Sequence, residues 1–249
     1  MPIDVQRVQD SAGFPTKVDV VVIGAGIVGS STAYELVRKG RSVALLEKGM
    51  VAGEQSGRNW GWVRQQNRDP HELPLAGYSL KRWGEFHSEI GADLGFRRAG
   101  CLYPTRDPAE LARWERWSER ARDFGFTNEV LSASQTRDRM KGSTSAWIGA
   151  IWSATDGKAE PSLAAPAIAA GAQALGAHLH QNCAVRGLDI ANGQVNGVWT
   201  ERGLVQADAV VRASGAGSSR FLRRQGVDLP GANIASGHGP MRAQEASET

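Results

Sequence analysis

A glycine-rich corner between a predicted strand and a predicted helix constrains this 249-residue chain more than any other feature. The short β-branched run at residues 18–23 ends in Gly24-Ala25-Gly26-Ile27-Val28-Gly29, which fits the pattern G-x-G-x-x-G. An apolar helical pattern then covers residues 27–39, and a second short strand follows at 42–46. This order predicts a β-α-β unit whose two parallel strands are joined by a right-handed crossover.

Each glycine of this corner has a physical role in binding a dinucleotide. Gly24 permits a sharp turn, Gly26 lets the backbone approach a pyrophosphate, and Gly29 lets the helix pack closely on the strand. The start of the helix offers unpaired N–H groups and the positive end of its dipole to phosphates. Glu47 follows the second strand, where a carboxylate can accept hydrogen bonds from ribose hydroxyls. The pattern therefore predicts a dinucleotide site, and the acid at position 47 disfavours NADP, leaving NAD and FAD.

Composition excludes several other classes of protein. Hydrophobic residues make up 41% of the chain and the net charge is only +3, which is typical of a globular protein and gives no support to nucleic-acid binding. Cys101 and Cys183 lie far apart and the five histidines have no ligand spacing, so neither a disulfide framework nor a metal site is expected. No apolar run reaches the roughly 20 residues of a membrane-spanning helix, and no secretory signal is visible, so we expect a cytoplasmic protein.

Strand and helix patterns alternate along the rest of the chain, which predicts an α/β fold. Residues 49–69 are too polar and too rich in glycine for a regular element. Asp107 is expected to cap a helix that starts at Pro108, with Glu110 in the third helical position. The predicted helices cover 71–90, 107–125 and 162–175, and the predicted strands cover 96–105, 177–181, 184–190, 194–199, 203–206 and 209–213.

Four sequence blocks, taken in order, resemble the amino-terminal part of the FAD-dependent D-amino-acid oxidase-like family, which includes glycine, sarcosine and D-amino-acid oxidases and dehydrogenases. The blocks are the glycine corner, Leu45-Leu46-Glu47-Lys48, Ser56-Gly57-Arg58-Asn59 and the strand and turn at 210–215. Asp156-Gly157 and Glu160-Pro161 also resemble the family's return into its cofactor domain. Arg212, Ser214 and Gly217 depart from the family's pattern at the second turn.

The resemblance implies an α/β fold with a Rossmann-like FAD-binding domain, made of a parallel sheet and a small β-meander, and part of an α+β substrate domain. The FAD-binding domain would be discontinuous, from residues 17–90 and 155–230, and residues 91–154 would supply the partial substrate domain. Residues 1–16 and 231–249 are expected to be irregular tails. Because family members continue well past residue 249, the C-terminal half of the fold would be absent, or a partner chain would complete it.

Carried over by position, the resemblance also implies a set of FAD contacts, made largely by backbone and small side chains. Gly24, Gly26, Ile27, Val28 and Gly29 would hold the pyrophosphate, Glu47 the adenosine ribose, and Lys48 would lie beside the adenine. Ser56, Gly57, Arg58, Asn59 and Gly61 would lie under the flavin side, Val185 would reach the adenine through its backbone, and Ala213 and Gly215 would close on the cofactor.

The implied chemistry is oxidation of the C–N bond of a small amine or amino acid by hydride transfer to the flavin, giving an imine and then a keto acid or an aldehyde. Trp60 and Trp62 could cover a substrate pocket or belong to the core. Arg64 could pair with a substrate carboxylate or lie on the surface. No catalytic residue is predicted. Two alternatives remain open, an NAD-dependent dehydrogenase and a non-catalytic FAD-binding fragment that needs a partner chain.

Overall fold

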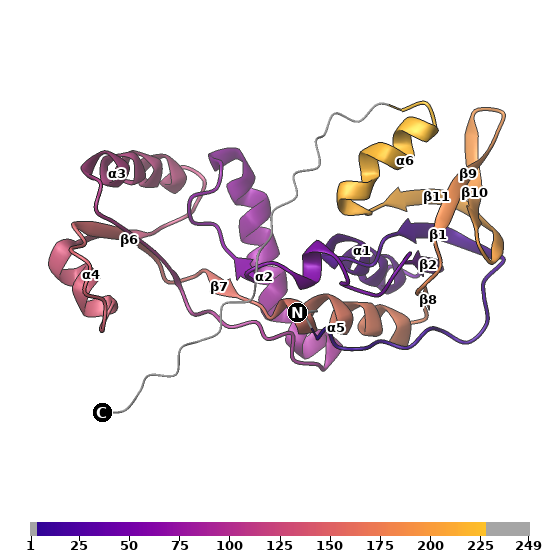
Figure 1. Cartoon of the computed structure of the whole chain (residues 1–249), viewed down its shortest axis with the longest axis horizontal. Coiled ribbons are helices and arrows are strands. Elements are labelled where there is room, and N and C mark those ends of the chain that lie inside the picture. Colours follow the sequence, from indigo (N-terminus) through magenta and orange to yellow (C-terminus); the bar gives the residue numbers. More distant parts are fainter. Residues whose placement is uncertain (1–3, 228–249) are drawn as a thin grey trace. The chain divides into compact units, whose positions relative to one another are not determined.

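The chain forms two compact units, described here by a computed structural model of residues 4–227. Of the described residues, unit 1 contains 4–59 and 161–227, and unit 2 is the segment between them, residues 60–160 (Figure 1). The first unit is discontinuous, and residues 60–90 and 155–160, which the predicted division assigns to the FAD-binding domain, lie in unit 2. The physical reason is strand pairing: β3 (Trp62–Val63) forms an antiparallel pair with β7 (Gly157–Lys158), so both segments share backbone hydrogen bonds inside unit 2.

Unit 1 is built on one six-stranded sheet in the order β8-β2-β1-β11-β10-β9. Four of its strands are parallel, namely β8 (His178–His180), β2 (Val43–Leu46), β1 (Lys17–Ile23) and β11 (Gly203–Arg212). The antiparallel strands β10 (Gln194–Thr200) and β9 (Val185–Ala191) extend it as a meander (Figure 1). The parallel sheet with a small meander is therefore confirmed. The two strands predicted at 203–206 and 209–213 are one continuous strand, because β11 pairs with β10 at its start and with β1 along the rest.

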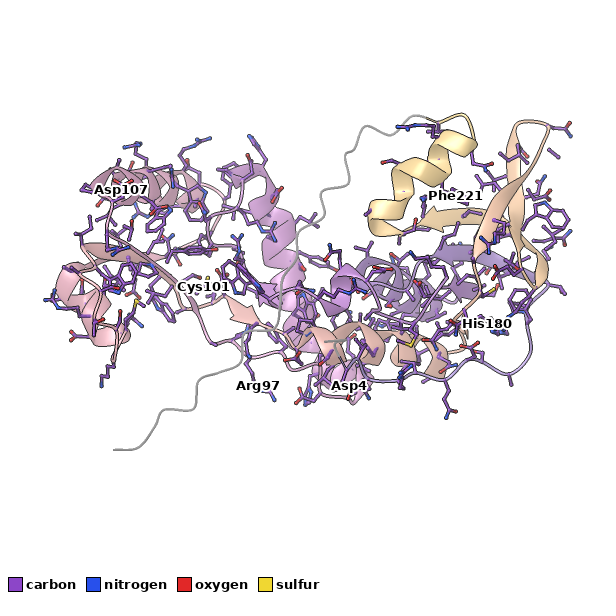
Figure 2. All side chains as sticks on the ribbon, viewed as in Figure 1. Asp4, Arg97, Cys101, Asp107, His180 and Phe221 are labelled. Carbon is purple, nitrogen blue, oxygen red and sulfur yellow. The ribbon has the colours of Figure 1, made fainter. Side chains whose placement is uncertain are left out.

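The core of unit 1 lies on both faces of this sheet. The β-branched residues of β1 and the apolar residues of β2 are almost all buried, as expected for central parallel strands. Helix α1 (Ile27–Arg38) packs against α5 (Pro161–Ala174), where small buried alanines allow close approach. A second apolar cluster includes Ile23, Leu46 and Val205, and Phe221 from α6 (Ser218–Arg224) packs on it (Figure 2). Helix α6 was not predicted.

Unit 2 contains a separate antiparallel sheet in the order β4-β6-β5. Its strands are β4 (Cys101–Thr105), β6 (Gly149–Ser153) and β5 (Glu129–Ser132), and its helices are α2 (Leu73–Ile90), α3 (Pro108–Arg122) and α4 (Ala133–Arg139). This arrangement agrees with the α+β character expected of the substrate domain. The strand predicted at 96–105 begins only at Cys101, since Gly95 and Gly100 both adopt positive φ angles. Strands β5 and β6 and helix α4 were not predicted.

The segment at residues 4–16 contains no helix or strand, as expected, yet hydrogen bonds attach it to unit 1. The Ser11 N–H donates to the Leu179 carbonyl at 2.9 Å, and the Gln181 N–H donates to the Asp10 carboxylate at 3.0 Å. Cys101 and Cys183 are both free thiols, half-buried and buried respectively. The tail predicted at 231–249 lies outside the described residues. Between residues 4 and 227, no helix has the length and apolar character needed to cross a membrane.

Candidate functional site

The glycine corner forms where β1 ends and α1 begins, and its backbone leaves no space for a side chain at Gly24 or Gly29. Gly24 has a φ angle of +101°, which L side chains rarely adopt, and a Cβ there would lie 2.7 Å from the Ala213 carbonyl oxygen. A Cβ on Gly29 would lie 1.8 Å from the Gly24 carbonyl oxygen. These two glycines therefore have the backbone roles expected from the pattern, a sharp turn and a close helix–strand contact.

The start of α1 is left without a side-chain cap of its own. Its N-cap residue is Gly26, in extended conformation, and the Ile27 N–H instead donates to the Ser56 hydroxyl oxygen at 2.9 Å. A Cβ on Gly26 would lie 2.9 Å from the same hydroxyl oxygen. Val28, in the first turn, is 64% exposed. This end of the helix, with its positive dipole end and small residues, thus remains open to an anionic ligand.

Ser56 reaches the corner because the loop at 50–58 folds back on it. The Ala52 N–H donates to the Ala25 carbonyl at 3.1 Å, and η1 (Gln55–Gly57) follows. Gly57 is buried, and a Cβ there would lie 2.3 Å from the Ala52 carbonyl oxygen. The structure therefore brings two of the predicted loop residues, Ser56 and Gly57, to the predicted corner.

Glu47 lies directly on the corner. Its Oε2 accepts a hydrogen bond from the Ala25 N–H at 2.8 Å, and its Oε1 accepts one from the Gly49 N–H at 2.9 Å. The side chain is only 8% exposed. This proximity follows from the parallel pairing of β1 with β2, which places the carboxyl ends of both strands at one edge of the sheet. Each carboxylate oxygen keeps a second lone pair that a ribose hydroxyl could use.

Two later segments meet the same edge of the sheet. The Ala213 N–H donates to the Ile23 carbonyl at 2.9 Å, so the second predicted turn packs directly on the first. Gly215 has a φ angle of +53° with open space at its Cβ position. The Cys183 N–H donates to the Glu47 carbonyl at 2.9 Å, which brings Val185, two residues further on, to the carboxyl end of β2.

Lys48 and Arg58, the two cations predicted at the site, both form ion pairs with Glu54. Lys48 Nζ lies 3.4 Å from the Glu54 carboxylate, and Arg58 lies 3.7 Å from the same carboxylate and donates to the Gly53 carbonyl at 2.7 Å. The Asn59 amide donates to the Gln55 and Ser56 carbonyls, so it closes the loop rather than pointing to the corner. Glu54 was not predicted as part of this loop, although a carboxylate four residues before an arginine is a recognisable signal of an ion pair.

The loop residue Gly61 belongs to unit 2. Its φ angle is +71°, and its carbonyl accepts a hydrogen bond from the Ala159 N–H at 2.8 Å. Gly61 therefore helps to join the two ends of unit 2, a role that the sequence did not indicate.

Two of the departures from the family's pattern prove to be linked. Arg212 donates from Nη2 to the Gly217 carbonyl at 2.6 Å, and its guanidinium lies 4.2 Å from the centroid of the Phe221 ring. Burial lowers the pKa of Arg212 below its ordinary value. Within residues 4–227, its Nε and Nη1 atoms are buried and make no hydrogen bond. Arg212 and Gly217 thus fix the second turn to α6.

The histidines give no support to a metal site. His180 is buried and its ring lies 4.9 Å from that of Phe14, which makes it a core residue (Figure 2). In the part of the chain that the structure describes, no three His, Cys, Asp or Glu side chains lie together as metal ligands would.

Taken together, the corner fits a dinucleotide. A dinucleotide requires the parts that meet here at one sheet edge. They are three positions where a Cβ would meet other atoms, a helix start whose own N-cap residue is a glycine, and a buried carboxylate. The residues that would contact it come from β1, β2, η1 and β11, all within unit 1.

Comparison with known proteins gives the same assignment. The family model described as "DAO: FAD dependent oxidoreductase" matches residues 19–243. A 4-methylaminobutanoate oxidase (formaldehyde-forming) from Paenarthrobacter nicotinovorans is 30% identical over 87% of this chain, and a sarcosine oxidase subunit beta from Arthrobacter is 30% identical over 85%. An L-amino acid deaminase from Proteus myxofaciens, solved in complex with anthranilate, superposes with a TM-score of 0.87 at 33% identity over 91% of this chain.

The chain spans only part of the length of these proteins. It covers 26% of the Paenarthrobacter oxidase, 54% of the Arthrobacter subunit and 52% of the Proteus deaminase. Because the family match includes the glycine corner and extends through β11, it identifies the dinucleotide as FAD rather than NAD. The chain belongs to the family of FAD-dependent oxidoreductases named DAO.

Proposed function

We propose that this chain holds FAD at the glycine corner of unit 1 and serves the oxidation of a C–N bond in a small amine or amino acid. The observation that carries the proposal is the contact of Glu47 with the Ala25 N–H, which joins the predicted ribose ligand to the predicted phosphate site at 2.8 Å. Membership of the FAD-dependent family supports the identity of the cofactor.

The chain's own residues would bind and orient the cofactor. The first-turn N–H groups of α1 would face the pyrophosphate, and Glu47 would accept hydrogen bonds from the adenosine ribose. Ser56 would keep the loop beside the phosphates through its bond to the Ile27 N–H. Ala213 and Gly215 would close on the cofactor from the second turn, and Val185 would offer its backbone to the adenine.

The remaining proposed contacts require a rearrangement or belong to the second unit. Lys48 beside the adenine and Arg58 near the phosphates would each have to loosen the ion pair with Glu54. Gly57 and Asn59 would act by shaping the loop. Gly61 lies in unit 2, and its contact with the cofactor stays a prediction of the resemblance alone.

When bound, FAD supplies the two-electron acceptor for a hydride from the substrate carbon next to nitrogen, and the resulting imine hydrolyses in water to a keto acid or an aldehyde. The names of the similar proteins support the substrate class. 4-Methylaminobutanoate, sarcosine, L-amino acids and anthranilate all carry both an amino group and a carboxylate. We therefore propose that the substrate of this chain also carries both groups.

Spectroscopy of the purified chain tests this proposal. We expect the flavin absorbance bands to co-purify with the protein, and we expect an amino acid from a panel of N-methyl, small and aromatic amino acids to bleach them under anaerobic conditions. A matched panel of the corresponding hydroxy acids, which lack the C–N bond, should leave the bands unchanged.

Two results would contradict the proposal in different ways. A chain that binds no flavin would refute the cofactor site itself. A flavin-bound chain that no member of the panel bleaches would favour the alternative, an FAD-binding chain that needs a partner. The Arthrobacter relative, which is named as a β subunit, supports that alternative.

A further inference from the structure

The chain that precedes the first strand of unit 1 packs on the loop at 50–58, the loop that brings Ser56 to the start of α1. Val5 is buried, and a Cβ on Gly57 would lie 3.1 Å from the Cγ2 atom of this valine. The valine side chain therefore lies directly against the loop. We call residues 4–11 the N-terminal segment. All of these residues belong to unit 1.

The side chain of Gln181 joins the N-terminal segment to this loop. Its Oε1 accepts a hydrogen bond from the Val51 N–H at 2.9 Å. Its Nε2 donates to the Val8 carbonyl at 2.8 Å and to the Asp10 carboxylate at 3.2 Å. Because an N–H group needs an acceptor and a carbonyl needs a donor, these partners fix the orientation of the amide. One side chain thus connects two segments that lie 130 and 173 positions away from it in the sequence.

The loop needs such an anchor because the residue after Val51 has a strained backbone. Ala52 has a φ angle of +56°, in the left-handed region that residues with a Cβ rarely adopt. A strained conformation persists only where its surroundings hold it. Two hydrogen bonds do so here, the one from the Val51 N–H to Gln181 and the one from the Ala52 N–H to the Ala25 carbonyl of the glycine corner at 3.1 Å. Both loop residues are buried, so a lost partner would leave an N–H group unpaired.

The conformation of the loop in turn sets the position of Ser56. Its hydroxyl accepts a hydrogen bond from the Ile27 N–H at 2.9 Å, in the first turn of α1. A loop released at Val51 would no longer hold this hydroxyl at the start of the helix. Because a loop that becomes ordered only on binding subtracts its ordering cost from the binding free energy, a loop that is already ordered binds its ligand more tightly.

We propose that Gln181 is a positioning residue for the cofactor, which holds the loop at 50–58 in the conformation that binds FAD, and that the N-terminal segment braces this arrangement. The inference rests on the proposed function, since it takes FAD as the ligand of the glycine corner. Gln181 acts through Val51 and Ser56 rather than by contact with FAD. The N-terminal segment, which the sequence predicts to be part of an irregular tail, then contributes to the cofactor site.

Two measurements on the full chain test the proposal, equilibrium dialysis against FAD and amide hydrogen exchange of the flavin-free protein. Gln181→Leu removes the acceptor of the Val51 N–H and the donor to the N-terminal segment. We expect it to weaken FAD binding by roughly tenfold, the factor that about one lost hydrogen bond represents, and to speed amide exchange in the loop at 50–58. Gln181→Asn keeps an amide but is one methylene too short to reach both partners, so it should show the same changes.

Gln173→Leu is the matched control, because Gln173 is a second half-buried glutamine that holds the N-terminal segment. Its Nε2 donates to the Gln9 carbonyl at 3.0 Å and to the Ser11 hydroxyl at 2.9 Å, and among the described residues it makes no hydrogen bond to the loop at 50–58. This variant should keep the FAD affinity and the loop exchange of the wild-type chain. Circular dichroism should show the same fold for all variants.

The results separate this inference from the proposed function. The inference is overturned if Gln181→Leu binds FAD as tightly as the wild-type chain, or if its loop exchanges no faster. It is also overturned if Gln173→Leu loses as much affinity and protection, because a general loss of stability would then explain both variants. A wild-type chain that binds no FAD would instead contradict the proposed function, and exchange of the flavin-free variants would still show whether Gln181 holds the loop.

Discussion

At the scale of single residues, the backbone of the glycine corner is packed so closely that the Cβ of an alanine would clash with neighbouring atoms. The Gly29 position faces the Gly24 carbonyl oxygen, which belongs to the backbone and cannot rotate away as a side chain can. The Gly26 position faces only the hydroxyl of Ser56, which can rotate. These two glycines should therefore respond differently to substitution.

Gly29→Ala is expected to destabilise unit 1 by about 3 kcal/mol or more, because the new Cβ would lie 1.8 Å from a backbone oxygen and the helix would have to move off the strand. Urea denaturation followed by circular dichroism measures the loss. Gly187→Ala, at a strand position with open space at the Cβ, should change the free energy of unfolding little. Equal stabilities of the Gly29→Ala and wild-type chains would show that the close contact is absent.

His180 is expected to make the free energy of unfolding depend on pH. Burial lowers its pKa below the ordinary value of 6.5, with Arg202 and His178 acting in the same direction and Asp10 against them. The unfolded chain therefore takes up a proton at a higher pH than the folded chain does. The stabilising effect of the neutral ring is present above the ordinary histidine pKa and is lost as the pH falls below it.

Urea denaturation between about pH 7 and pH 5 should show this loss, and His180→Leu should reduce its slope. His71→Leu, at an exposed position of unit 2, is the control and should keep the slope of the wild-type chain. A His180→Leu variant with an unchanged slope would exclude His180 as its source.

At the scale of elements, local signals in the sequence located helix α3 well. The Asp107 side chain accepts a hydrogen bond from the Ala109 N–H at 2.9 Å, as its predicted capping role requires. Glu110 does not complete a capping box, however. Its two oxygens accept hydrogen bonds from the Thr105 hydroxyl at 2.7 Å and from Arg113 at 3.1 Å. A neighbouring strand thus competes with the helix terminus for this carboxylate.

Asp107→Ala should therefore cost about 1 kcal/mol of unfolding free energy, the usual contribution of an N-cap. Asp107→Asn keeps an oxygen acceptor and should cost only a few tenths of this amount. Thermal unfolding of both variants measures the difference, and equal losses would indicate that the charge of Asp107, rather than its cap bond, stabilises α3.

Elements without a strong local signal could not be predicted from the sequence. Strand β6 at residues 149–153 has few polar residues to mark its ends, and only its pairing with β4 and β5 on either side defines it. Helix α4 does have a capping box, in which Ser132 accepts from the Gln135 N–H, but it is only seven residues long. The corner was predictable because backbone sterics fix it within six residues, whereas the Glu54 ion pairs depend on the folded loop.

At the scale of the whole molecule, the chain enters unit 1, leaves it at residue 59 and returns at 161. The resemblance implied a return to the cofactor domain near Glu160-Pro161 and assigned 60–90 to that domain, whereas 60–90 lie in unit 2. Pairing of β3 with β7 is a contact between residues nearly a hundred positions apart, which no local pattern reveals. Every predicted cofactor residue except Gly61 nonetheless falls in unit 1.

The FAD content of purified Gly26→Val and Gly187→Val chains tests the central claim most directly. Gly26 has an extended backbone and only a rotatable hydroxyl nearby, so the valine variant should fold, and its branched side chain should occupy the position of the phosphates. We predict that Gly26→Val folds but retains no flavin, while Gly187→Val retains as much as the wild-type chain. Full flavin content in Gly26→Val would contradict the assignment of the corner as the cofactor site.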